Sequence, residues 1–94
     1  MFKIRVSCQG ISEPVALASI TAILEEFATR PWHQSVSCRW DKDRIVLVAE
    51  NDYDSNGQAL LGEFSDAICA CLPIEPDPIT FAVESVSEFP GSNA

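Results

Sequence analysis

The stretch Phe2-Lys3-Ile4-Arg5-Val6-Ser7-Cys8-Gln9 decides the fold. Its apolar and polar residues alternate without interruption, which is the pattern of a β-strand that buries one face. Gly10 follows and ends the strand. The pattern therefore predicts a sheet with one face against a core and one face turned away from it.

Two amphipathic helices are predicted after this strand. The first begins at Ser12-Glu13-Pro14, where Ser12 suits the N-cap and Pro14 the first turn, and it ends before Pro31. The second follows the turn-rich segment 51–57 and stops at Pro73. The expected apolar stripes are Leu17, Ile20, Leu24 and Phe27 in the first helix, and Leu60, Leu61, Phe64, Ile68, Cys71 and Leu72 in the second.

Three further strands complete the pattern. Residues 36–40 alternate, residues 45–49 form a continuous apolar run, and the short polar turn Asp41-Lys42-Asp43 joins them as a hairpin. An extended connection through Pro73, Pro76 and Pro78 leads to the last strand, residues 79–86. The order βαββαβ resembles the ferredoxin-like fold across residues 2–87. We expect an α+β domain over residues 1–89, with a four-stranded antiparallel sheet and two helices on one face, and a flexible tail over residues 90–94.

Composition agrees with such a domain. The 94 residues are 47% apolar and 21% charged, so a core is expected and disorder is not. Neither a signal peptide nor a run of about 20 apolar residues is evident. The four cysteines have irregular spacing, which favours reduced thiols over a disulfide framework. These features predict a cytoplasmic protein that does not enter membranes.

Charge is distributed unevenly along the chain. The net charge is −8, which disfavours generic binding to nucleic acids and anionic membranes. All six basic residues lie at or before Arg44, whereas nine acids and no base follow residue 45. This asymmetry has two interpretations, an ordinary acidic protein or a charge-complementary interface.

The uncovered sheet face is the expected interface. The predicted strands place on it the basic residues Lys3, Arg5 and Arg39, together with Ser7 and Ser37. Further members of this face are Val46, Val48, Thr80, Ala82 and Glu84. The leading hypothesis is a non-enzymatic interaction or regulatory module that binds a protein partner or a second copy, as a homodimer, through this face or through its acidic surface. RNA-binding sheets of this topology stack bases on aromatic residues of the open face. Phe2 and Trp40 are expected on the opposite face, so we do not expect nucleic-acid binding.

Residues 52–63 match the calcium-loop pattern D-x-[DN]-x-[DN]-G-x5-E. Side-chain oxygens of Asp52, Asp54, Asn56 and Glu63, with the Gln58 carbonyl, would supply the ligands that calcium requires. The alternative is a helix start, with Ser55 and Gln58 as a capping box and the helix beginning near Asn56. On the first interpretation, the chain is a calcium- or small-ligand-binding regulatory domain that uses the loop from Asp52 to Glu63; calcium is the single candidate cofactor, and otherwise we expect none.

The segment Cys8-Gln9-Gly10-Ile11 resembles part of the phosphate-binding loop of acylphosphatases, which are also βαββαβ proteins. The hairpin from Arg39 to Glu50 is similar to that family as well. The sequence departs from the family at two functional positions, with Pro14 in place of the phosphate-binding arginine and Trp40 in place of the water-orienting asparagine. The resemblance therefore implies the fold without the activity, a degenerate acylphosphatase-like protein. We expect no catalytic residue and no enzymatic function.

Overall fold

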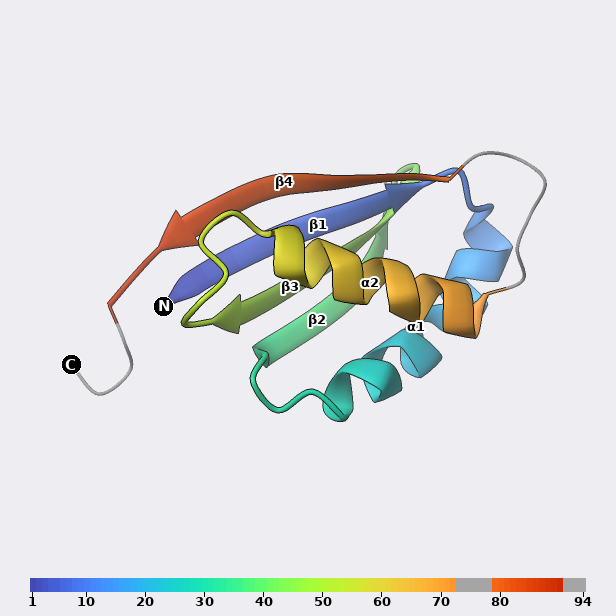
Figure 1. Ribbon diagram of the computed structural model, residues 1–94. Helices are drawn as coiled ribbons and strands as arrows, with labels where there is room; N and C mark the ends of the chain where they lie inside the picture. The colour runs from blue at the N-terminus through green and yellow to red at the C-terminus, as the bar shows by residue number, and fades with distance from the viewer. Residues whose placement is uncertain (73–78, 91–94) are drawn as a thin grey trace.

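The computed structural model describes residues 1–72 and 79–90. Its elements are, in order, β1 (Phe2–Gln9), α1 (Glu13–Ala28), β2 (Gln34–Asp41), β3 (Arg44–Asn51), α2 (Gln58–Cys71) and β4 (Thr80–Glu88). They form an α+β fold with one four-stranded antiparallel sheet and two helices (Figure 1). The expected proline-rich connection at residues 73–78 lies outside the described residues, as does the predicted tail apart from Pro90.

The strands lie side by side in the order β2-β3-β1-β4. The alternating strand at the start of the chain, β1, is central and pairs with β3 on one side and β4 on the other. Both helices pack on the same side of the sheet, and the other face has no helix over it among the described residues (Figure 1). Because β3 lies between β1 and β2, Cys8 and Cys38 are two strands apart, and all four cysteines are free thiols.

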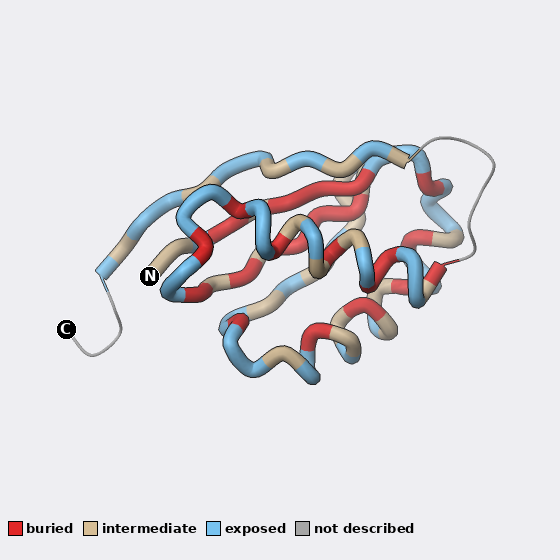
Figure 2. The backbone as a smooth tube through the Cα atoms, viewed as in Figure 1, coloured by how far each residue is buried: buried red, intermediate tan, exposed pale blue. Residues whose placement is uncertain are grey.

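The core lies between the sheet and the helices. Ile4, Val6 and Cys8 of β1 are fully buried, as the alternating pattern predicted, and β3 contributes Ile45, Leu47 and Ala49. Figure 2 shows these two central strands as the most continuously buried part of the chain. The edge strands β2 and β4 are only partly buried, so the core is deepest beneath the middle of the sheet.

The predicted apolar stripe of α1 is correct at Phe27 and displaced by about one residue in the rest of the helix. The buried residues of this helix are Ala16, Ser19, Ile23 and Phe27, whereas Leu17 is 55% exposed. Both sets recur at helical spacing, and neighbouring residues differ by about 100° around the helix axis. Ser19 can be buried because its hydroxyl donates to the carbonyl of Val15 (2.8 Å), and periodicity alone did not anticipate a polar core residue.

A β-bulge changes which residues of β4 face each side. The pairing of β1 with β4 shifts between Arg5 and Val6, so that Arg5 pairs with Ser85 and Val6 with Val83. Glu84 is the extra residue at this point. Beyond the bulge, Ser85 and Ser87 replace the even-numbered residues on the open face, and the strand continues to Glu88 rather than stopping at residue 86.

Candidate functional site: the open face of the sheet

The open face is built from matched rows of residues across the four strands. One row consists of Ser37, Val48, Arg5 and Ser85, in the order β2-β3-β1-β4. On one side of it lies the row that contains Arg39, and on the other the row that contains Lys3. The three basic residues predicted for the open face, Lys3, Arg5 and Arg39, therefore lie on successive rows, whereas Ser85 and Ser87 stand where the prediction continued the even-numbered residues of β4.

These rows enclose a shallow depression of about 470 Å³. Cationic and hydroxyl side chains surround two valines in it; the lining residues are Lys3, Arg5, Ser37, Arg39, Val46, Val48, Ser85 and Ser87. Val46 is only 1% exposed although no helix of the described chain covers this face. The long side chains around it therefore form walls, and the valines form an apolar floor.

An ion-pair cluster closes one end of the face. Glu84, at the bulge of β4, accepts hydrogen bonds from Arg5 Nε (2.9 Å) and from Arg44 of β3. Asp41 pairs with the same two arginines, at 3.3 Å from Arg5 Nη2 and 3.5 Å from Arg44 Nη2. The hydrogen bond from Arg44, assisted by Ser7 and Arg5, holds the pKa of the Glu84 carboxyl at about 2, well below its ordinary 4.5.

Two cations of the depression have no such partner. Within residues 1–72 and 79–90, no carboxylate forms an ion pair with Lys3 or with Arg39, and both residues are exposed. The positive charge of Arg5, by contrast, is balanced by Glu84 and Asp41. Five of the six residues predicted as an interface line this one depression: Lys3, Arg5, Arg39, Val46 and Val48. The sixth, Glu84, belongs to the ion-pair cluster beside it.

The segment 52–63 is arranged around a helix start. Asp54 is buried, and its two carboxylate oxygens accept the backbone N–H groups of Ala59 (3.2 Å) and Leu60 (2.8 Å). Asn56 Oδ1 accepts the N–H of Gln58 at 3.0 Å. The helix starts at Gln58 with Gly57 as its N-cap, so Asp54 and Asn56 replace the predicted Ser55–Gln58 capping box.

The predicted calcium ligands point to different partners. The Glu63 carboxylate contacts His33 and Arg30, Asp54 is used at the helix start, and Asp52 is exposed in the connection. Over the described residues, no group of three or more His, Cys, Asp or Glu side chains is placed to hold a metal ion. This geometry favours the helix-start interpretation of the segment over the calcium loop.

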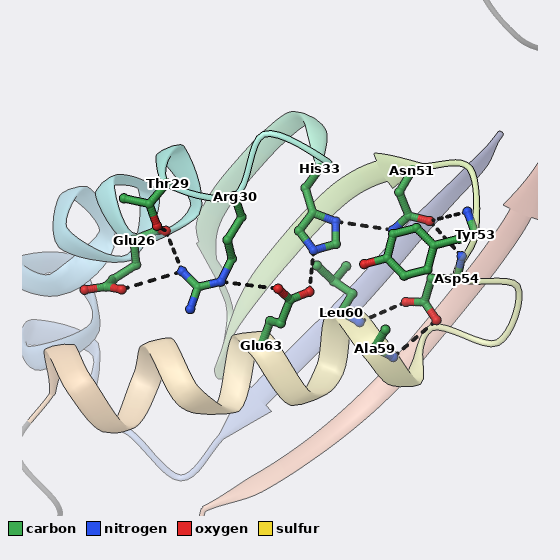
Figure 3. A network of polar contacts seen from close by, with 10 residues as sticks. All are labelled: Glu26, Thr29, Arg30, His33, Asn51, Tyr53, Asp54, Ala59, Leu60 and Glu63. Atoms are coloured by element: carbon green, nitrogen blue, oxygen red, sulfur yellow. Dashed lines mark hydrogen bonds and ion pairs between the residues drawn. The ribbon is translucent and has the colours of Figure 1, made fainter.

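Sequence reasoning missed a polar network around His33 (Figure 3). Asn51 Oδ1 accepts the N–H groups of Tyr53 (3.2 Å) and Asp54 (2.8 Å), so its Nδ2 group donates to His33 Nδ1 at 3.3 Å. His33 Nδ1 therefore carries the lone pair, and Nε2 carries the proton that it donates to Glu63 Oε2 at 2.6 Å. The His33 side chain is fully buried, and through it the network joins three segments of the chain, the α1–β2 connection, the end of β3 and α2.

The two positions at which the chain departs from acylphosphatases have ordinary structural roles. Pro14 lies in the first turn of α1, where a missing N–H is tolerated, and it is exposed. Trp40 packs against the core on the helix side of β2.

No helix within the described residues has the length and apolar character needed to cross a membrane. In comparisons with known proteins, the chain matches no family model, no curated protein and no solved structure.

Proposed function

We propose that this chain is a non-enzymatic binding module that holds an acidic protein segment on the open face of its sheet. The proposal depends on one observation, the depression in which Lys3 and Arg39 lack ion-pair partners among the described residues. The strand order is that of the ferredoxin-like fold, and we infer that the chain adopts it. The apolar floor of Val46 and Val48 and the serine hydroxyls supply contacts that an isolated pair of surface cations lacks.

Charge favours a different partner over a second copy of the chain. In a two-fold symmetric dimer through this face, the same patch would meet itself, and the unpaired cations Lys3 and Arg39 would oppose their own copies. Such like-charge pairing opposes association, whereas an acidic segment is complementary to it. The homodimer expected from the sequence is therefore the less favoured arrangement.

The spacing of the two cations indicates the form of the segment. Arg39 is in register with Ser7 through Val46, two strands away, and Lys3 is four residues from Ser7 along β1. From strand spacings and rise per residue, their Cα atoms lie about 16 Å apart. An extended chain places residues i and i+4 about 13 Å apart on one side, within reach of both side chains. The expected partner is an extended segment with two carboxylates separated by three residues.

The test uses a labelled peptide with glutamates at positions i and i+4, measured by fluorescence anisotropy at low salt. Arg39→Glu and Lys42→Glu each change the net charge from −8 to −10, but only Arg39 lines the depression. Arg39→Glu should weaken binding roughly tenfold, because it replaces an attraction with a repulsion, and Lys42→Glu should weaken it less than about twofold.

Four results would overturn the proposal. The first is no binding of the acidic peptide, and the second is equal loss in the two variants. The third is a single-stranded oligonucleotide that binds more tightly than the peptide with the same dependence on Arg39, which would indicate a nucleic-acid site. The fourth is a dimer in light scattering that Arg39→Glu dissociates, which would indicate that the face is a self-interface.

A further inference from the structure

Two exposed aromatic side chains lie next to His33. Trp32, in the connection before β2, is 49% exposed, and Tyr53, in the connection after β3, is 50% exposed. Their ring centroids lie 6.0 Å and 6.3 Å from the centroid of the buried His33 ring. Two connections far apart in the sequence therefore present an aromatic pair at one place on the surface.

The network in Figure 3 holds the backbone of Tyr53 and the ring of His33, which lies beside both aromatic side chains. The N–H of Tyr53 donates to Asn51, and His33 is fixed between Asn51 and Glu63. Trp32 is the residue adjacent to His33 in the chain. The backbone of Tyr53 is therefore held by a buried polar group and Trp32 directly precedes the fixed His33, so a ligand meets both aromatic residues on an ordered backbone.

The surroundings of the aromatic pair are acidic. Burial and the carboxylates of Glu63, Asp54 and Asp52 together raise the pKa of the Tyr53 hydroxyl. The guanidinium of Arg30 does not fill the site, because it pairs with Glu63 at 3.3 Å and lies 5.4 Å from the centre of the Phe27 ring. Three carboxylates near Tyr53 outnumber this one guanidinium, so the net charge around the aromatic pair is negative.

We propose that Trp32 and Tyr53, with Asp52, form a second binding site that takes a lysine or arginine side chain of a protein partner. Aromatic faces attract cations through their quadrupoles, and a neighbouring carboxylate adds direct attraction. The site is independent of the depression on the open face, which has the opposite charge preference. A partner with acidic and basic segments could then occupy both surfaces.

The two tryptophans of the chain provide a probe and an internal control. Trp32 belongs to the proposed site, whereas Trp40 lies near the far end of β2, about 20 Å along the strand from Gln34 by the rise per residue. In ¹⁵N-labelled protein at 150 mM NaCl, the peptide acetyl-Gly-Arg-Gly-amide should shift the Trp32 indole signal saturably and leave Trp40 unchanged. The matched peptide with glutamine in place of arginine should not saturate.

Variants of the site identify the side chains that bind the arginine peptide. Tyr53→Leu and Asp52→Asn should each weaken arginine-peptide binding roughly two- to fivefold, as expected for an exposed cation–π contact or charge pair. Leu17→Ala removes another exposed apolar side chain, on α1, and should leave binding unchanged. The unchanged Trp40 signal reports that each variant is folded. Absence of a saturable Trp32 shift, equal shifts with arginine and glutamine peptides, or unaltered binding by Tyr53→Leu would overturn the proposal.

Discussion

His33 joins three segments of the chain through one imidazole ring. It donates to Glu63 of α2, accepts from Asn51 at the end of β3, and lies in the connection between α1 and β2. In His33→Ala, the Asn51 amide and one Glu63 oxygen lose their partner in a buried setting, which should lower the free energy of unfolding by about 2–3 kcal/mol. Urea denaturation measures this loss. Gln34→Ala, at the exposed neighbouring position, should change it by less than about 0.5 kcal/mol, and an equally small change in His33→Ala would contradict the structural role of the ring.

This contact could not be predicted from the sequence. A lone histidine beside Pro31 and Trp32 has the character of a loop residue, and Glu63 fitted a calcium pattern instead. The two residues are 30 positions apart, and only the packing of α1 and α2 against the sheet brings them together. Local sequence patterns predict individual helices and strands. The burial of His33 depends on how these elements pack against one another, which local patterns do not show.

Two glycines provide a matched pair of substitutions. Gly57 has φ +78°, and a Cβ there would lie 2.8 Å from Val83 Cγ1. Gly57→Ala should destabilise the fold by about 2–4 kcal/mol, since it combines left-handed strain with a steric clash in the core. Gly62 lies in α2, and a Cβ added there would meet no packing neighbour within 4 Å. Gly62→Ala should instead stabilise by about 0.5–1 kcal/mol through helix propensity. Thermal unfolding followed by circular dichroism separates the two, and changes of the same sign would contradict the different roles of these glycines.

At the scale of elements, the sequence located β1, α1, β2 and α2 from their periodic apolar residues and β3 from its continuous apolar run, with terminators such as Gly10 and Pro31. The prediction from sequence failed where the orientation of a residue depends on a neighbouring element. The bulge at Glu84 arises from the pairing of β4 with β1, so the face of Ser85 and Ser87 could not be read from β4 alone. The depression consequently contains two serines that the sequence prediction lacked.

The bulge of β4 also predicts a pH dependence. Glu84 has a pKa of about 2 in the folded protein against an ordinary 4.5, mainly because of the hydrogen bond from Arg44. Its contribution to stability is therefore fully present above about pH 4.5 and is lost as the pH falls toward 2. In Glu84→Gln, the free energy of unfolding should fall less steeply over this window than in the wild type, as measured by urea titrations at several pH values. Glu88→Gln, on the same strand but outside the ion-pair cluster, should retain the wild-type slope. Identical slopes in all three proteins would show that the Arg44–Glu84 pair contributes nothing.

Over the whole molecule, the net charge of −8 coexists with a depression that carries two unpaired cations among the described residues. Mutual repulsion of the excess carboxylates destabilises the compact state, and salt screens it. Raising NaCl from 10 to 300 mM shortens the screening length from about 30 Å to about 6 Å and should raise the free energy of unfolding by roughly 1 kcal/mol. Replacing Lys3 and Arg39 together by glutamine takes the charge from −8 to −10, since two positive charges are removed, and should enlarge this increment. Replacing Glu13 and Glu25 by glutamine takes it from −8 to −6 and should reduce the increment. If the wild type instead loses stability in salt, the local pairs of Glu84 and Asp41 with Arg5 and Arg44 outweigh the repulsion of the whole chain, and the ion-pair cluster is then the dominant electrostatic feature of the fold.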